Sequence, residues 1–252
     1  KWQFIAGGDE NPESWDGKSL HELYVKAVMP WEWHEPLQKY AHDLGLHFFS
    51  TPQDQAGIDL LEKLNVPCYK VASYELTHTP LLEAMGRTGK PVIMSVGYAS
   101  VEEIDEAVKT LRDSGTKELM LLHCITAYSD NPVPEESNLA SIKELADKYD
   151  CVSGFSDNNA GIDIPLASVM LGAAAVEKHV VADSEDETFD QDFSLDPGDL
   201  KLMVDKIKDF EKMVGKPHFG PQSEKEANNM RYRRSLYAAE DIKAGEALTP
   251  GN

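Results

Sequence analysis

Val101-Glu-Glu-Ile-Asp-Glu-Ala-Val-Lys-Thr-Leu111 lies between two short apolar runs, Pro91-Val-Ile-Met94 and Leu119-Met-Leu-Leu-His-Cys124. Its apolar residues at 101, 104, 107, 108 and 111 recur at the spacing of one helix face. The flanking runs are continuously apolar, which is typical of strands buried on both faces of a parallel sheet. This stretch therefore predicts a strand, a covering helix and a second strand parallel to the first.

The same unit recurs along most of the chain. Six apolar runs are each followed by a turn and a helical stretch: Leu46–Phe49, Cys68–Ala72, Pro91–Met94, Leu119–Cys124, Cys151–Phe155 and Ala174–Val180. Because strands and helices alternate throughout, the sequence predicts an α/β protein with a parallel sheet covered by helices.

Polar residues follow nearly every predicted strand, and this favours a closed barrel over an open doubly wound sheet. They include Ser50, Thr51, Ser73, Glu75, Ser95, Thr126, Tyr128, Ser156, Asp157 and His179. A barrel draws its site from all of its βα loops, whereas an open sheet concentrates it at one switch point. No glycine-rich dinucleotide or phosphate loop is found. We therefore predict a (β/α)8 TIM barrel whose first two strands are expected before residue 1.

After about residue 196 the alternation of strands and helices ends, and the sequence predicts a long helix, a linker and a second domain. Asp196-Pro197 is a typical helix start, and its helix is expected to run to about Val214. We assign 1–215 to an incomplete barrel domain, 216–234 to a charged linker and 235–252 to the start of a second, truncated domain.

Composition narrows the function classes. The 252 residues are 41% hydrophobic, enough for a substantial core, and 24 Lys+Arg against 44 Asp+Glu give a net charge of −20. This charge argues against nucleic acid and anionic membranes as partners. The three scattered cysteines and the lack of a signal peptide or membrane-spanning run predict a cytoplasmic location.

Lys70 and the serines near it form a candidate anion site. Lys70 precedes Ser73 and Glu75, and a lysine with nearby hydroxyls supplies donors to a phosphate or carboxylate. The alternative is a lysine that reaches solvent and serines that cap helices.

His179 ends the last predicted strand and is a candidate metal ligand or general base. Asp157, Asn158, Asp190, Gln191 and Asp192 offer oxygen ligands for Mg²⁺ or Mn²⁺. A hydrogen-bonded structural histidine and a Schiff-base role for Lys178 are the alternatives. From these residues alone we predict a barrel enzyme for a small anionic substrate.

A series of short motifs, in order along nearly the whole chain, resembles the sialic acid synthase family. They are Leu23-Tyr24, Pro30-Trp-Glu-Trp-His34, Phe49-Ser-Thr-Pro52 with Asp54, Tyr69-Lys-Val-Ala-Ser73 with Glu75, Gly89-Lys-Pro91 with Ser95, Cys124 with Tyr128 and Asn138-Leu139, Gly154-Phe-Ser-Asp157, Glu177-Lys-His179, Phe193-Ser-Leu195 and Arg233-Arg-Ser-Leu-Tyr237. The Pro30–His34 and Phe193–Leu195 motifs look most like the pseudaminic acid synthase branch.

The resemblance implies a TIM barrel followed by a small antifreeze-like domain, which 235–252 would begin, in a homodimer. It implies condensation of phosphoenolpyruvate with an open-chain amino sugar, giving a nine-carbon 2-keto acid such as pseudaminic acid, plus phosphate. It also implies a divalent metal, Mn²⁺ or Mg²⁺, that polarises the aldehyde oxygen.

Residue roles follow from the same resemblance. Lys70, Glu75 and Tyr128 would be catalytic, and Glu75, Tyr128 and Asp190 would contact the sugar. Phosphoenolpyruvate would be held by Thr51, Lys70, Ser73, Ser95 and Ser156. His179 would bind the metal, but Asn158 stands where the family has a second metal histidine. Since an amide oxygen is the harder and weaker ligand, metal affinity should fall and preference shift toward Mg²⁺.

Two alternatives stay open at this point. One is a different sugar, the precursor of N-acetylneuraminate or of legionaminate. The other belongs to another class: a non-catalytic remnant that binds a sugar or an anion, suggested by Asn158 and the two strands missing from the pattern.

Overall fold

The computed structural model describes residue 25, residues 28–182 and residues 190–252. It contains a parallel sheet of five strands: β1 (Tyr69–Val71), β2 (Val92–Ser95), β3 (Leu119–Ile125), β4 (Val152–Asp157) and β5 (Val176–Lys178). The helices are α2 (His34–Asp43), α3 (Gln55–Lys63), α4 (Thr79–Arg87), α5 (Val101–Ser114), α6 (Ser141–Tyr149), α7 (Asp163–Met170), α8 (Pro197–Val214) and α9 (Glu224–Asn229). Short 3₁₀ turns occupy Trp31–Trp33, Ser73–Glu75, Pro134–Glu136, Gln191–Phe193 and Met230–Tyr232.

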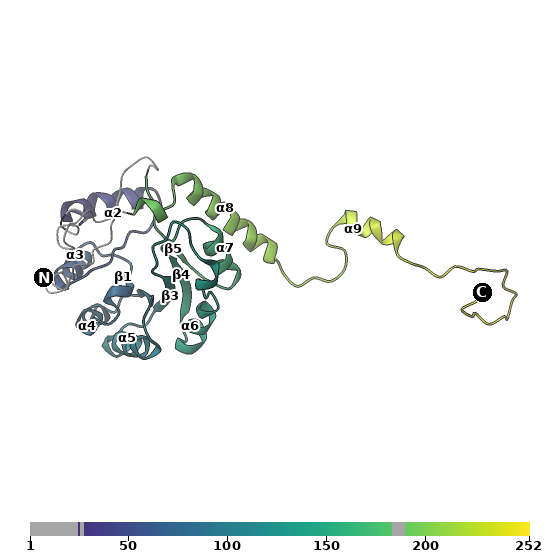
Figure 1. Ribbon diagram of the computed structural model, residues 1–252, viewed down its shortest axis with the longest axis horizontal. Coiled ribbons are helices and arrows are strands. Elements are labelled where there is room, and N and C mark those ends of the chain that lie inside the picture. The colour runs from purple at the N-terminus through teal and green to yellow at the C-terminus, as the bar shows by residue number, and fades with distance from the viewer. Residues whose placement is uncertain (1–24, 26–27, 183–189) are drawn as a thin grey trace. The chain divides into compact units, whose positions relative to one another are not determined.

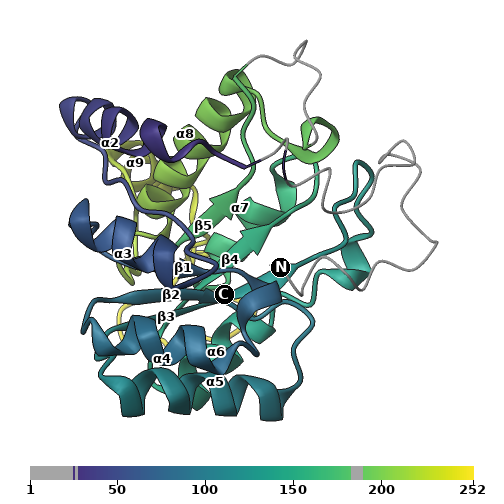
Figure 2. The ribbon, with the colours of Figure 1, turned by 90° about the vertical axis from the view of Figure 1, so that its left-hand side faces the viewer.

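The order of the strands distinguishes the two candidate architectures. It is β1-β2-β3-β4-β5, so each strand pairs only with its neighbours in sequence. A doubly wound sheet reverses this order at a switch point, whereas a barrel does not. Helices α3 to α7 lie around the outside of the strands in Figure 1, and Figure 2 shows α4, α5 and α6 on the same face. The structure confirms the α/β class and shows a barrel-type sheet over β1–β5.

Local signals in the sequence explain where the elements begin and end. Helix α5 starts at a capping box, in which Ser100 and Glu103 each satisfy the other's backbone N–H. It buries Ile104, Ala107, Val108 and Leu111, as the helical spacing predicts, whereas Val101 in the first turn is exposed. Helix α8 covers Pro197–Val214, which confirms the predicted start and end.

The main core lies between the sheet and the helices α3, α4 and α5. Its fully buried members include Tyr69, Val71, Leu82, Met85, Met94, Leu111 and Leu121. These apolar side chains occupy the face of the sheet that is covered by helices. The polar side chains that alternate with them along the strands therefore lie on the opposite face.

Two predicted strands differ from the structure. Leu46–Phe49 is extended but forms no strand: the carbonyl of Ser50 accepts one hydrogen bond from the Lys70 N–H, at 3.3 Å. A single hydrogen bond is not enough to form a strand, which needs a series of backbone bonds to its neighbour. The predicted strand Ala174–Val180 is shortened to β5, although a bridge joins Val180 to Leu195.

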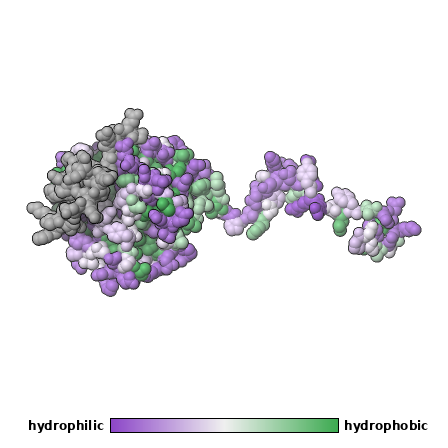
Figure 3. All heavy atoms as spheres, viewed as in Figure 1, coloured by the Kyte–Doolittle hydropathy of each residue, from purple (hydrophilic) through white to green (hydrophobic). Residues whose placement is uncertain are grey.

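The chain divides into two units, residues 1–210 and 211–252. The second unit holds the end of α8, α9 and otherwise turns, and its large apolar side chains are exposed, Phe219 to 96%. Hydrophobic residues are visible on its surface in Figure 3. Among the described residues, no helix has the length and apolar character needed to cross a bilayer.

Candidate active site

Lys70 of β1 is the centre of a buried polar group at the sheet. Its ammonium donates hydrogen bonds to Ser95 Oγ of β2 and to the Val71 carbonyl, both at 2.8 Å. It also lies 3.6 Å from a carboxylate oxygen of Glu177 on β5. Burial lowers the pKa of Lys70, against the opposing attraction of Glu177. The lysine does not reach solvent, so the snorkelling alternative is wrong.

Ser156 on β4 belongs to the same group. Its hydroxyl donates to Glu177 Oε1 at 2.7 Å, the oxygen that faces Lys70. The register pairs Ser156 with Glu177 directly across β4 and β5. Glu177 was not among the predicted site residues; it lies on β5 two residues before His179, and this spacing was the signal that could have placed both on one face.

Ser73 and Glu75 follow β1 in a 3₁₀ turn and are buried without their full complement of hydrogen bonds. Among the described residues, Ser73 Oγ and Glu75 Oε2 have no partner. Burial raises the pKa of Glu75, although Lys70 acts in the opposite direction. Buried unpaired polar atoms are rare in folded proteins, and a bound ligand, an ordered water or a catalytic role is the usual explanation.

His179 meets Asn158 beyond the ends of β5 and β4. His179 Nε2 lies 3.1 Å from Asn158 Oδ1, and His179 Nδ1 lies 3.5 Å from a carboxylate oxygen of Asp190. The Asn158 amide donates to the Ile125 carbonyl at 2.7 Å and to Cys124 Sγ at 3.4 Å. Since both amide hydrogens are used, the amide oxygen is directed at the imidazole.

Aromatic rings enclose this pair. Tyr128 and Phe193 each pack edge-on against the His179 ring, with centroids 6.1 and 5.2 Å away, and against each other at 5.2 Å. Tyr128 adopts a left-handed backbone, with φ of 51°, at the turn that presents its side chain. Burial raises the pKa of its hydroxyl, which stays protonated and able to donate a hydrogen bond.

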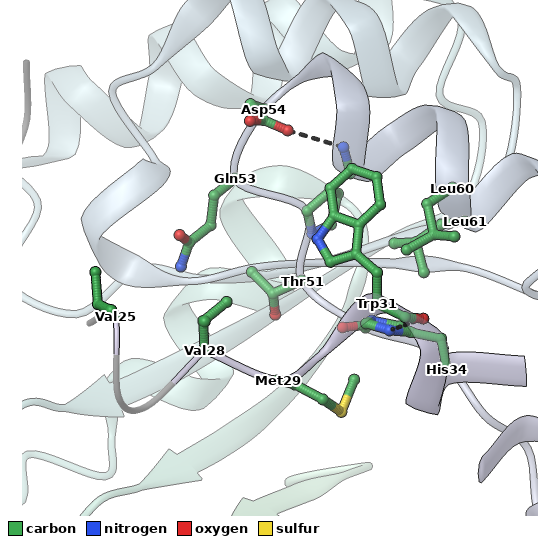
Figure 4. A pocket seen from close by; sticks show the side chains of 13 residues that line it. Val25, Val28, Met29, Trp31, His34, Thr51, Gln53, Asp54, Leu60 and Leu61 are labelled. Atoms are coloured by element: carbon green, nitrogen blue, oxygen red, sulfur yellow. Dashed lines mark hydrogen bonds between the residues drawn. The ribbon is translucent and has the colours of Figure 1, made fainter. Parts of the chain in front are cut away.

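Thr51 lines a different cavity from the residues above. This cavity has a volume of about 550 Å³ and is lined by residues of 28–34, by 50–54 and by α3. Figure 4 shows Thr51, Val28 and Trp31 around it, with Asp54 accepting a hydrogen bond from the Gly57 N–H at the start of α3. The structure thus brings Lys70, Ser95 and Ser156 together, and Asn158, His179, Asp190 and Tyr128 together. Thr51 lines the cavity just described and directly follows Ser50, whose carbonyl accepts a hydrogen bond from the Lys70 N–H.

The donor atoms of His179 and Asn158 fit a divalent metal. Two atoms bound at about 2.1 Å and at right angles are roughly 3.0 Å apart, close to the 3.1 Å found here. Within the described part of the chain, no group of three or more His, Cys, Asp or Glu is placed to hold a metal. A metal here would therefore need water or substrate oxygens to complete its coordination.

Known proteins share both the sequence and the fold. The profile of the NeuB family matches residues 6–219. The pseudaminic acid synthase of Helicobacter pylori is 37% identical over 94% of this chain and 68% of its own length. The N,N'-diacetyllegionaminic acid synthase of Campylobacter jejuni is 36% identical over 93% of this chain and 70% of its own.

A solved structure is similar over most of the chain. The crystal structure of N-acetylneuraminic acid synthetase from Leptospira borgpetersenii, in complex with citrate, superposes with a TM-score of 0.74 at 30% identity. The superposition covers 88% of this chain and 78% of the synthetase chain. The profile match and these relatives agree with the motifs and with the barrel-type sheet. The chain belongs to the NeuB family, the family of sialic acid synthases.

Proposed function

We propose that this protein condenses phosphoenolpyruvate with an open-chain amino sugar aldehyde, forming a carbon–carbon bond and releasing phosphate. The observation that carries the proposal is the buried Lys70, bonded to Ser95 and facing Glu177, next to unpaired Ser73 and Glu75. A buried ammonium and adjacent hydroxyls suit a small, highly charged anion in a chain whose net charge is −20.

The anion-binding residues would hold phosphoenolpyruvate and orient its C3. Lys70 bridges two strands, and its hydrogen bonds fix the ammonium before substrate arrives, which reduces the reorganisation needed for the reaction. Ser73 Oγ, free of protein partners, would donate to a phosphate oxygen. Ser95, whose hydroxyl oxygen accepts from Lys70, would add its own hydrogen as a donor, and Ser156 would donate after its hydroxyl turns away from Glu177.

Glu75 and Tyr128 would act at the aldehyde. As C3 of phosphoenolpyruvate bonds to the aldehyde carbon, the aldehyde oxygen gains negative charge and takes a proton. The raised pKa of Glu75 lets this carboxyl hold a proton to give, and protonated Tyr128 would donate a hydrogen bond to the sugar. The bond between C2 of phosphoenolpyruvate and the phosphate oxygen breaks, and one water supplies the oxygen of the new ketone. In the overall reaction one proton of this water ends on the former aldehyde oxygen and the other on the released phosphate.

His179 and Asn158 would hold a divalent metal, Mn²⁺ or Mg²⁺. Bound there, it would supply Lewis-acid polarisation of the aldehyde. Asp190, near His179 Nδ1, would orient the imidazole.

The sugar we propose is the 2,4-diacetamido-2,4,6-trideoxy-altrose type that yields pseudaminic acid. It is supported by the Pro30–His34 and Phe193–Leu195 motifs and by the Helicobacter pylori relative. We further propose a homodimer for the complete protein, with 235–252 beginning an antifreeze-like domain. The relatives named synthases and the Arg233–Tyr237 motif support this.

The decisive assay measures phosphate release from phosphoenolpyruvate with each of the three sugar precursors and Mn²⁺ or Mg²⁺. Lys70→Ala should lower turnover at least about 100-fold, since it removes the buried charge that the anion needs. Lys90→Ala is the matched control: this lysine pairs with Glu62 at 2.9 Å and with the Val66 carbonyl, remote from the site. Unchanged turnover in Lys70→Ala would show that the site is wrongly assigned, and phosphoenolpyruvate binding without release of phosphate would favour a binding protein.

A further inference from the structure

Asp157 and Lys178 lie next to the candidate metal ligands but on the other face of the sheet. The register pairs Asp157 of β4 with Lys178 of β5. Asn158 and His179 each follow one of them directly, and successive side chains of a strand point to opposite faces. Lys178 therefore faces away from the site, which does not suit a Schiff-base lysine.

The ion pair between them is completely buried. Their side chains are 2% and 0% exposed, and Lys178 Nζ donates to Asp157 Oδ2 at 2.8 Å. Lys178 also donates to the Asn159 carbonyl. The other oxygen, Asp157 Oδ1, accepts from the backbone N–H and from the side-chain amide of Asn159, both at 3.1 Å.

Asn159 extends this network to a third strand end. Its Oδ1 accepts from the Ser129 N–H at 3.3 Å, and the Ala160 N–H donates to the Ser129 carbonyl at 2.8 Å. Ser129 directly follows Tyr128. The group formed by Asp157, Lys178 and Asn159, here named the Asp157 cluster, thus joins the loops after β3, β4 and β5.

The Asp157 cluster supplements the backbone pairing of β5, because β5 forms few backbone hydrogen bonds of its own. It has three residues, paired with β4, and beyond it a bridge joins Val180 to Leu195. The distance between His179 and Asn158 depends on the register at this end. A hydrogen-bonded buried ion pair fixes one arrangement, although such a pair adds little to net stability.

We propose that the Asp157 cluster consists of positioning residues, which hold Asn158, His179 and Tyr128 in the arrangement that binds metal and sugar. The proposal rests on the proposed function to the extent that His179 and Asn158 bind a metal. Residues that orient metal ligands without touching the metal change affinity by about 10- to 100-fold when they are altered.

The test is the double variant Asp157→Asn/Lys178→Met in the full chain. It removes both charges together, keeps the side-chain volumes and leaves no buried charge unpaired. The control is Glu62→Gln/Lys90→Met, which removes another ion pair, of 2.9 Å, elsewhere in the same unit. Mn²⁺ binding is measured by electron paramagnetic resonance of the free ion, and folding by circular dichroism.

We expect the dissociation constant for Mn²⁺ to rise about 10- to 100-fold in Asp157→Asn/Lys178→Met and to stay unchanged in the control. Unchanged affinity in the folded double variant would overturn the proposal. If the double variant does not fold, Asn159→Ala takes its place, because it keeps the ion pair and removes the side-chain links to Asp157 and Ser129. A loss of affinity of several-fold is then expected, and no loss would overturn the proposal.

A second readout separates this proposal from the proposed function. Long-range ¹H–¹⁵N spectra of the His179 ring, assigned with His179→Gln, report which ring nitrogen carries a proton. The parent should show one fixed protonation form of the ring, held between Asn158 and Asp190, and the double variant a mixture of forms. If the parent binds no Mn²⁺, the metal part of the proposed function fails. The ring spectra then decide the positioning role, and identical spectra in parent and variant would overturn it.

Discussion

Asn158 turns its amide oxygen toward His179 because its two amide hydrogens are already bonded, to Ile125 and Cys124. The family position was predicted to weaken metal binding, and the structure adds how the weaker ligand is oriented. For single residues, the sequence predicted which side chains belong to the site, but it did not predict which atoms they bond to. Lys70, Ser95 and Ser156 were predicted as anion-site residues, whereas the carboxylate of Glu177 that joins them depends on register across several strands.

Asn158→His should raise the affinity for Mn²⁺ by on the order of tenfold, about 1.4 kcal/mol. An imidazole nitrogen is a better donor than an amide oxygen to such metals, and the side chain would start beside His179. Equilibrium titration with Mn²⁺ measures the effect. Glu106→His, on the exposed face of α5, adds a histidine away from the site and should change nothing. Equal or weaker binding by Asn158→His would show that the two positions do not share a metal.

The loop after β2 comes unusually close to the turn after β1, because Gly97 has no side chain. Gly97 has φ of +37°, and a Cβ there would lie 2.6 Å from Ser73 Cβ and Oγ. Strand ends from different βα units are thereby packed into one site. A single sequence shows the glycine but not the neighbour that requires it.

Gly97→Ala should raise the KM for phosphoenolpyruvate about tenfold and destabilise the fold by roughly 2 kcal/mol, since it displaces Ser73 and strains the backbone. Gly89→Ala is the control: φ is +72°, but no atom lies within 4 Å of its Cβ. It should cost about 1 kcal/mol and leave KM unchanged. Steady-state kinetics and urea unfolding measure both variants. A KM that rises equally in the two would mean that strain alone, not the contact with Ser73, is responsible.

Element by element, the sequence predicts most of the sheet because buried parallel strands have a strong apolar signature. Five of the six predicted strands are present, with shifted ends. Leu46–Phe49 has the same signature yet forms no ladder: its link to β1 is the hydrogen bond from the Lys70 N–H to the carbonyl of Ser50, just after the run. Leu46 and Phe49 are also exposed, to 59% and 38%, so in this run the apolar composition predicted neither burial nor pairing.

For the whole molecule, burying polar groups at the site lowers the free energy of unfolding, while the same groups are available to bind a ligand. Glu75 is buried with one oxygen unpaired, and its pKa is raised by burial. A carboxyl with a raised pKa in the folded state stabilises the fold at pH values below its unfolded pKa, and this contribution disappears as the pH rises through the folded value. The ionised carboxylate is therefore the destabilising form.

Glu75→Gln should increase the free energy of unfolding at pH 8 by on the order of 1 kcal/mol, because it removes a buried charge of which one oxygen has no hydrogen-bond partner. The gain should disappear near pH 4, where the parent carboxyl is protonated. Phosphate release should be lost. Urea unfolding at the two pH values measures the effect. The same gain at both pH values would contradict the ionisation argument.

The strictly sequential order of β1 to β5 also bears on how the chain is made. About 20 residues separate the end of β1 at Val71 from the start of β2 at Val92. At roughly 5–20 residues per second of synthesis, each strand is joined by its partner within a few seconds of leaving the ribosome. The sheet can therefore assemble one βα unit at a time as translation proceeds. Each of the five described strands has a partner in an adjoining βα unit, which shortens the time that its apolar surface is open to aggregation.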